Sequence, residues 1–170
     1  MDQVASGINQ TIKAITNREG KYLTFSLADE EYGIGILKVK EIIGMMPITS
    51  VPQTPLFVKG VINLRGKVIP VIDLRLKFGM EGVKPTEKTC IVVVETKNGK
   101  DTVLIGIVVD SVSEVLNIKG SDIEETPAFG QRLETDYILG MAKINGGVKI
   151  LLDIDKVLGS DKMAIFSEVA

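Results

Sequence analysis

The chain has 170 residues, of which 45% are hydrophobic and 25% charged, and its formal net charge is −2. These values are typical of a soluble globular protein and predict no basic surface for nucleic acid or anionic membrane, and no membrane-spanning segment. Histidine is absent, which excludes a phosphohistidine relay, Ser-His and Cys-His nucleophiles, and most zinc sites. Because Cys90 is the single cysteine, no internal disulfide can form, and a reducing cytoplasm is the expected location.

The first predicted elements are a loose tail and two strands. Residues 1–20 are expected to be mostly unstructured, because an isolated short helix is marginal in water. From Leu23 to Leu27 apolar side chains alternate with hydroxyls, which predicts a strand with one buried face. A second strand is expected from Tyr32 to Ile36. The spacing from Leu37 to Ile43 fits a helical turn or a strand, and both remain open.

A duplicated pattern organises the rest of the chain. The sequence from Gly60 to Gly79 predicts a strand, a tight turn, a second strand and a capped helical turn. The same pattern recurs from Gly140 to Gly159 when Gly60 is aligned with Gly140. Two upstream blocks recur in the same order, since Gly33 aligns with Gly106 and Pro55 with Pro127. Ordered blocks of this kind indicate a duplicated β-rich unit.

The duplication predicts a division of the chain into modules. Many short strands with turn signals and few helices favour a mostly β fold of two small five-stranded barrels. The expected segments are a tail over 1–20, a first barrel over 21–82, a second barrel over 83–160, and a C-terminal tail or helix end over 161–170. Short helices, one of them near the C-terminus, complete the prediction. Whether terminal segments cross between barrels stays open.

Asp73 and Asp153 occupy equivalent positions in the two copies. Such a pair resembles an aspartic-protease dyad, but the sequences Asp-Leu-Arg and Asp-Ile-Asp lack the small hydroxyl residue and glycine that orient those carboxylates. Each Asp precedes a short amphipathic stretch and a glycine, which predicts a helix N-cap. A carboxylate-dependent hydrolase that uses Asp73, Asp110 or Asp153 is the enzyme alternative. It requires Asp73 and Asp153 to face a shared cavity rather than cap separate helices.

Arg65 is the residue that the repeat does not explain. The equivalent turn in the second copy is Asn145-Gly146, and Asn tolerates the positive φ of a two-residue hairpin. A guanidinium offers no such advantage, but at a hairpin tip it is exposed and binds carboxylates with two parallel hydrogen bonds. The alternative interpretation is a solvated charge. The asymmetry between the copies favours a binding role.

An apolar series surrounds Glu41 in the first copy, formed by Ile34, Ile36, Val39 and Ile42. Most of these side chains are expected in the core, because inward-facing residues fill small barrels. Two small interiors need fewer apolar positions than the chain supplies, so some are expected to line an exposed groove. An amphipathic helix is the partner that suits such a groove.

Four segments closely resemble the CheW family, the coupling (adaptor) proteins of bacterial chemotaxis: GVINLRGKVIPVIDLR, EEYGIGILKVKEI, GIVVDSVSEVL and ILLDIDKVL. The resemblance covers about residues 20 to 160. It implies two SH3-like β-barrels related by pseudo-symmetry, with a hydrophobic core between them. The same domain occurs in the kinase CheA and the hybrid adaptor CheV. A chain of this length has no room for a kinase or receiver domain, so a stand-alone adaptor is expected.

The resemblance implies a non-enzymatic scaffold without cofactor or metal, which couples the cytoplasmic tips of methyl-accepting chemoreceptors to the regulatory domain of CheA. A cytoplasmic monomer outside the receptor array is expected, recruited to membrane-bound arrays through its partners, with no nucleic acid bound and no direct membrane insertion. The receptor-binding residues carried over are Leu23, Ile36, Val39, Glu41, Ile42, Arg65 and Val112. The kinase-binding residues are Cys90, Val115 and Phe129. A generic peptide-binding barrel pair is the remaining alternative.

Overall fold

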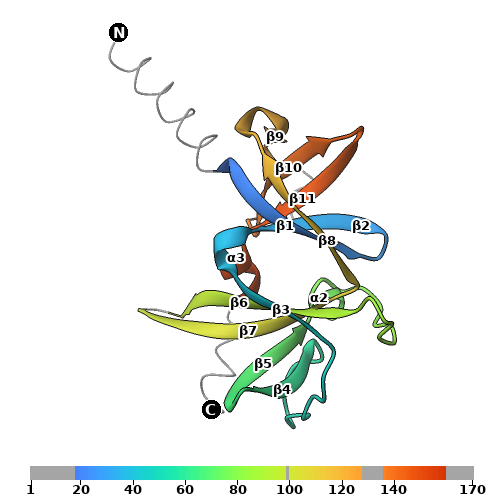
Figure 1. The fold of residues 1–170 in the computed structure, drawn as a ribbon, viewed down its shortest axis with the longest axis vertical. Helices are drawn as coiled ribbons and strands as arrows, with labels where there is room; N and C mark the ends of the chain where they lie inside the picture. Colours follow the sequence, from blue (N-terminus) through green and yellow to red (C-terminus); the bar gives the residue numbers. More distant parts are fainter. Residues whose placement is uncertain (1–17, 99, 128–135, 160–170) are drawn as a thin grey trace.

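The structure is a computed structural model of the chain, and it describes residues 18–98, 100–127 and 136–159. Figure 1 shows two twisted sheets stacked one above the other, with short helices between them. The predicted mostly β fold of two SH3-like barrels is confirmed. None of the helices in the described ranges is long and apolar enough to cross a membrane.

The first sheet has the strand order β8-β1-β2-β11-β10-β9. All neighbours are antiparallel except β11 and β2, which are parallel. The strands span β1 Gly20–Leu27, β2 Glu30–Gly35, β8 Ser111–Ile118, β9 Ile123–Glu124, β10 Ile138–Ile144 and β11 Gly147–Leu152.

The second sheet has the order β3-β6-β7-β5-β4, and its parallel pair is β5 with β7. The strands span β3 Val39–Gly44, β4 Val58–Leu64, β5 Lys67–Asp73, β6 Cys90–Asn98 and β7 Asp101–Val109. Short helices follow the two hairpins, α2 (Leu74–Lys77) after β5 and α3 (Ile154–Leu158) after β11. Two 3-10 turns, η1 (Ile36–Lys38) and η2 (Gly120–Asp122), follow β2 and β8. The ambiguous segment before Gly44 is therefore a 3-10 turn followed by a strand.

The strands of the two copies are exchanged between the sheets. The first two strands of the first copy, β1 and β2, pair with β8 and β11 of the second copy. Reciprocally, β6 and β7 of the second copy pair with β3 and β5 of the first. The sheets therefore do not follow the expected division at residues 82 and 83, because both take strands from each half. The physical reason is that β2 and β7 lead into connections that cross to the other sheet.

Three apolar clusters hold this arrangement together. The largest lies between the sheets and draws on both of them and on α3; we call it the central core. Smaller clusters fill the two barrels, one around Ile69 in the second sheet and one around Leu151 in the first. Along β6, Val92 and Val94 point into the central core while Ile91 and Val93 point into the barrel. The core between barrels that the family resemblance implied is present.

Both predicted helix N-caps are confirmed. The Asp73 carboxylate accepts the backbone N–H of Leu76 at the start of α2, and Asp153 does the same for Lys156 at the start of α3. The glycine stop after each helix takes a different form. Gly79 has a φ of 77°, the left-handed conformation that favours glycine, whereas Gly159 has a φ of −91°. At Gly159 a Cβ would lie 2.4 Å from the Asp155 carbonyl oxygen, so close packing explains that glycine.

A second close approach explains why the repeats begin with glycine. In β4 the segment at Thr49 crosses the strand, and a Cβ on Gly60 would lie 1.9 Å from the Thr49 carbonyl oxygen. In β10 strand β9 crosses at the equivalent place, and a Cβ on Gly140 would lie 2.9 Å from the Glu124 carbonyl oxygen. Only glycine leaves room for the crossing backbone at these positions. Of the predicted tails, the described part covers residues 18–20 and none of 161–170.

Candidate protein-docking surface

The tip of the β4–β5 hairpin carries Arg65. Its φ is 51° and that of Gly66 is 87°, the pair of positive values that a two-residue type I′ turn requires. The Asn63 carboxamide oxygen accepts the N–H of Gly66 at 2.8 Å and supports the turn. A non-glycine residue in the left-handed region costs about 1 kcal/mol, a cost that Asn bears more readily than Arg. The arginine is therefore not present for the sake of the turn.

Arg65 forms a two-pronged ion pair with Glu41 of β3. The Nη1–Oε1 and Nη2–Oε2 distances are 2.9 and 2.5 Å. The arginine side chain is 70% exposed and the glutamate 31%, so the guanidinium stays accessible to a second carboxylate. The hydrogen bonds from Arg65 hold the pKa of Glu41 below its ordinary value, and the pKa of Arg65 is raised in turn. Both groups remain charged at neutral pH.

A β-bulge directs Glu41 toward the hairpin tip. Val39 faces Val94 and Glu41 faces Val93, so β3 has one extra residue, Lys40, at this point. Bulges of this kind redirect side chains at the edges of sheets. Strands β3 and β4 are the two edges of the second sheet, and the Arg65–Glu41 pair joins them. The pair therefore helps to close the barrel and also presents a charged margin to solvent.

The apolar residues of the expected receptor-binding set differ in exposure. Ile42, next to Glu41 in β3, is 44% exposed. Ile36, Val39 and Val112 are half-buried and pack against the central core. Leu37 in η1 is 89% exposed, and the sequence analysis did not select it. The signal was weak, because a leucine between Ile36 and Lys38 looks like one more member of a buried series.

Leu23 corrects one expectation. It is 1% exposed and lies in the central core, so its side chain offers no surface to a partner. Strand β1 lies between β2 and β8, and Leu23, Phe25 and Leu27 alternate onto the face that packs against the second sheet. The buried face predicted from the alternation is the correct description of this residue. Leu23 supports the surface from below.

The residues of the expected kinase site lie in different sheets. Cys90 begins β6 and is half-buried against the central core, with its thiol donating to the Lys88 carbonyl at 3.2 Å. Val115 in β8 of the first sheet is 47% exposed. It is the repeat equivalent of Ile42 in the alignment that places Gly33 on Gly106, and both lie on edge strands. Phe129 lies outside the described residues.

The carboxylates of the hydrolase alternative are engaged elsewhere. Asp73 and Asp153 cap helices that follow hairpins of different sheets. The Asp110 carboxylate accepts hydrogen bonds from Nε and Nη2 of Arg75, at 2.7 and 2.6 Å. The described part of the chain has no group of three or more Cys, Asp or Glu side chains that could hold a metal ion. Asp73 and Asp153 therefore cap separate helices, as the N-cap prediction requires.

Comparison with known proteins agrees with this description. Residues 21–162 match the CheW-like domain. The chain is 43% identical over 150 residues to the chemotaxis protein CheW of Klebsiella aerogenes, which covers 88% of each sequence. The chain belongs to the CheW-like domain family.

Further relatives extend the match. The chemotaxis protein CheW of Rhizobium meliloti is 34% identical, over 88% of this chain and 94% of that protein. The crystal structure of the scaffolding protein TtCheW from Thermoanaerobacter tengcongensis superposes with a TM-score of 0.73 at 35% identity. That match covers 85% of this chain and 95% of TtCheW. Scaffolding in chemotaxis is thus the function of the family to which the chain belongs.

Proposed function

We propose that the chain is a non-enzymatic chemotaxis adaptor that couples the cytoplasmic tips of chemoreceptors to the histidine kinase CheA. Family membership supports the scaffold role, since the matched relatives are chemotaxis proteins and one is described as a scaffolding protein. The protein would act in the cytoplasm and reach membrane-bound receptor arrays through its partners.

The observation that carries the proposal is the exposed Arg65–Glu41 pair beside exposed Ile42. Arg65 occupies a strained turn position that Asn145 fills in the second hairpin. A residue kept at a conformational cost on an exposed tip is best explained by what it binds. A receptor tip is a helical bundle, and a helix presents both an apolar stripe and charged flanks to such a surface.

In the proposed mechanism, apolar contacts provide the affinity for a receptor helix and charged contacts fix the position of that helix along the surface. Burial of a receptor helix against the exposed Ile42 and the accessible parts of Ile36, Val39 and Val112 supplies most of the affinity. Arg65 and Glu41 at the margin fix the register by pairing with charges on the helix. The pre-formed ion pair limits the side-chain entropy lost on binding, because the guanidinium is already held in one orientation. The proposed kinase contacts are the exposed Val115 in the first sheet, Cys90 in the second sheet, and Phe129.

A ternary sedimentation assay tests the proposal. Receptor signalling-tip fragments on vesicles and the CheA regulatory domain are mixed with the protein, and the fraction that pellets is measured. Arg65→Ala should reduce co-sedimentation with the receptor fragment about tenfold, as expected when loss of a charged hydrogen-bonding contact costs about 1.4 kcal/mol. Lys67→Ala removes an exposed cation from the same hairpin and serves as the matched control.

The outcomes separate the two parts of the proposal. If the wild-type chain retains neither partner, the adaptor function is wrong and the generic peptide binder becomes the better description. If the wild type retains both partners and Arg65→Ala binds as well as Lys67→Ala, the adaptor function stands and the role of Arg65 is wrong. Circular dichroism of each variant verifies that the fold is intact.

A further inference from the structure

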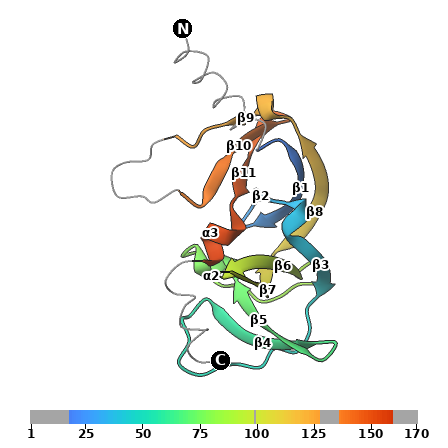
Figure 2. The same cartoon turned by 90° about the vertical axis from the view of Figure 1, so that its left-hand side faces the viewer.

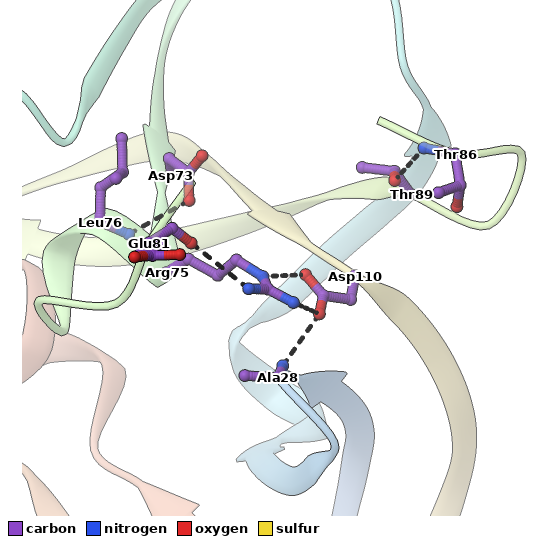
Figure 3. A network of polar contacts seen from close by, with 8 residues as sticks. All are labelled: Ala28, Asp73, Arg75, Leu76, Glu81, Thr86, Thr89 and Asp110. Carbon is purple, nitrogen blue, oxygen red and sulfur yellow. Dashed lines mark hydrogen bonds and ion pairs between the residues drawn. The ribbon is translucent and has the colours of Figure 1, made fainter. Parts of the chain in front are cut away.

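A charged junction ties α2 to the opposite sheet. Arg75 of α2 holds Asp110, which lies directly after β7, through Nε–Oδ1 and Nη2–Oδ2 hydrogen bonds of 2.7 and 2.6 Å (Figure 3). The same carboxylate accepts the backbone N–H of Ala28, in the β1–β2 turn, at 2.9 Å. We call Arg75, Asp110 and Ala28 the α2 junction. Its side chains are 16% and 26% exposed, so the pair is largely shielded from solvent.

A second junction ties α3 to the other sheet. Asp155 of α3 accepts a hydrogen bond from Lys38 at 2.6 Å, and Lys38 ends η1, directly after β2. The other oxygen of Asp155 accepts the backbone N–H of Lys97, at the end of β6, at 3.2 Å. We call Asp155, Lys38 and Lys97 the α3 junction. Figure 2 shows α2 and α3 at the level where the two sheets meet.

The two junctions are equivalent in the repeat but opposite in polarity. Asp155 is the repeat equivalent of Arg75 in the alignment that places Gly60 on Gly140. Asp110 is the equivalent of Leu37, the immediate neighbour of Lys38, in the alignment of the upstream blocks. In each junction the helix, the connection after the central strand and the β-turn of a hairpin meet in the same way. In one the helix contributes the cation, and in the other it contributes the anion.

The hairpin turns near the two junctions differ in charge. The β1–β2 turn near Arg75 contains Asp29 and Glu30, and Asp29 contributes to raising the pKa of Arg75 after the larger effect of Asp110. The β6–β7 end contains Lys97, whose backbone N–H bonds Asp155, and also Lys100 and Asp101, so it has no single charge sign. The connection after the central strand is therefore the part that carries a charge opposite to the helix in both junctions.

An alternative pairing of the duplicated strands would reverse these matches. Because the copies are similar, each could close on itself, with β5 beside β2 and β11 beside β7. The repeat register would then place α2 at the end of β2, where Arg75 would meet Lys38. It would equally place α3 at the end of β7, where Asp155 would meet Asp110. Both junctions would bring like charges together in a partly buried place, where each pair would repel instead of attract.

We propose that the opposed polarity of the α2 and α3 junctions selects the exchanged strand pairing and disfavours closure of each copy on itself. The apolar patterns of the two copies are similar, since β2 and β7 repeat each other and so do β5 and β11, but they differ at one pair of positions. Lys149 of β11 pairs with Glu31 of β2, whereas the equivalent positions in β5 and β7 hold the buried Ile69 and the half-buried Leu104. This difference also favours the exchanged arrangement, and the junction ion pairs act beside it. The inference is independent of the partners proposed above, because it concerns only how this chain pairs its own strands.

Exchanging the two helix charges tests the proposal. The double variant Arg75→Asp/Asp155→Arg mismatches both junctions in the exchanged arrangement and matches both in the self-closed one. The control is the fourfold variant Arg75→Asp/Asp110→Arg/Lys38→Asp/Asp155→Lys, which inverts both junctions while keeping them matched for exchange. Neither variant alters the net charge of the chain.

Backbone nuclear Overhauser effects in the refolded full chain report the pairing. The exchanged arrangement gives contacts between Val71 and Gly106 and between Leu151 and Gly33. The self-closed arrangement would give Val71 with Gly33 and Leu151 with Gly106. Wild type and the fourfold variant should show the first set alone. In the double variant the ratio of exchanged to self-closed chains should fall at least about tenfold, the effect of a difference of about 1.4 kcal/mol.

Refolding yield supplies a second measurement. If the double variant does not fold, the neutral variant Arg75→Gln/Asp155→Asn carries the test, because it removes the charge discrimination without adding repulsion. It should refold with both sets of contacts, whereas a control with Lys67→Gln/Asp101→Asn, on exposed positions, should refold with the native set alone. A double or neutral variant that refolds with only the native contacts, at the wild-type yield, would overturn the proposal.

Discussion

In the β4–β5 hairpin the tip residue is Arg65, whereas in the β10–β11 hairpin it is Asn145. Their φ angles are 51° and 52°, and a glycine with positive φ follows each of them. Val68 and Val148 follow at equivalent positions and are 68% and 53% exposed. Asparagine is therefore sufficient to form this type of turn, and what the arginine provides in addition is the ion pair with Glu41. The two hairpins have the same fold, and only the first has a charged residue at its tip. This difference indicates that the surface around Arg65 has a function that the second hairpin lacks.

The largest expected loss of stability is for substitution of Gly60, the glycine at which another backbone segment crosses the first hairpin, and a smaller loss is expected at its equivalent, Gly140. Gly60→Ala should lower the free energy of unfolding by about 4 kcal/mol, because its φ is 142° and the new Cβ would meet the rigid Thr49 carbonyl at 1.9 Å. Gly140→Ala should cost about 2 kcal/mol, since the Ile123 side chain at 2.7 Å can shift and the Glu124 carbonyl oxygen, at 2.9 Å, is much farther from the new Cβ than Thr49 is at Gly60. Urea unfolding measures both. Equal losses would contradict the proposed difference in backbone crossing.

The two ion-paired junctions should differ in strength. Asp110→Asn should cost about 2 kcal/mol at pH 7, because two charge-assisted hydrogen bonds from Arg75 are lost from a shielded site. Asp155→Asn should cost about 1 kcal/mol, since Lys38 donates a single hydrogen bond there. Urea unfolding at neutral pH gives both values. A larger loss for Asp155→Asn would reverse the order of the junctions.

Lowering the pH should remove the stabilisation that the Asp110 carboxylate provides. The hydrogen bonds from Arg75 and the N–H of Ala28 lower the pKa of Asp110 below its ordinary value of 3.8. A depressed pKa means that the carboxylate stabilises the fold above pH 3.8 and that this stability is lost as the pH falls through the folded pKa. The difference between wild type and Asp110→Asn should therefore shrink from pH 7 to pH 3. A difference that grows with acidity would contradict the sign.

Substitution of the exposed apolar residues on the edge strands should change stability little and partner binding strongly. Ile42→Ser and Val115→Ser change half-exposed residues on the edge strands, so each should cost less than about 0.5 kcal/mol of stability. Under the proposed function, Ile42→Ser should weaken co-sedimentation with receptor fragments and Val115→Ser should weaken binding to the CheA regulatory domain. Both are measured with purified components. If the two variants affect the same partner, the edge strands do not divide the partners between them.

The smallest change in stability is expected for Arg65→Asn, which gives the first hairpin the tip of the second. Loss of an exposed ion pair costs little, and relief of the left-handed arginine returns a similar amount, so the melting temperature should move by less than about 2 °C. Receptor binding should fall as for Arg65→Ala. A marked loss of stability would indicate that the Arg65–Glu41 pair mainly closes the barrel.

The sequence predicted local structure well. The duplicated hairpins, the caps at Asp73 and Asp153, and the mostly β fold all follow from patterns that depend on a few neighbouring residues. Arg65 was also identified from the sequence alone, because the equivalent position in the second copy is Asn145. Its ionic partner Glu41 was predicted only as another member of the receptor-binding set, since the bulge at Lys40 that directs Glu41 has no clear local signature.

Strand partners could not be predicted in the same way. The strands around Gly33 and Gly106 share their glycine and the following isoleucine, so the local pattern gives β5 only a weak preference between β2 and β7. The choice depends on crossings between the sheets and on contacts between residues that lie far apart in the sequence, such as Arg75 with Asp110. Leu23 shows the reverse case. Its alternation pattern already indicated burial, and the expectation carried over from relatives placed it on the surface.

The exchange of strands has a consequence for the order of events during synthesis. The second sheet uses only β3 to β7, an uninterrupted stretch from Val39 to Val109, whereas the first sheet joins β1 and β2 to β8 through β11. The second sheet can close as soon as its last strand leaves the ribosome, but the first must wait for the C-terminal strands and close a long loop. Before β7 is made, β2 has an unpaired edge and β5 is its available partner. Synthesis from the N-terminus thus makes the wrong partner available first, and only when β7 has paired with β5 would an early folding intermediate be built on residues 39–109.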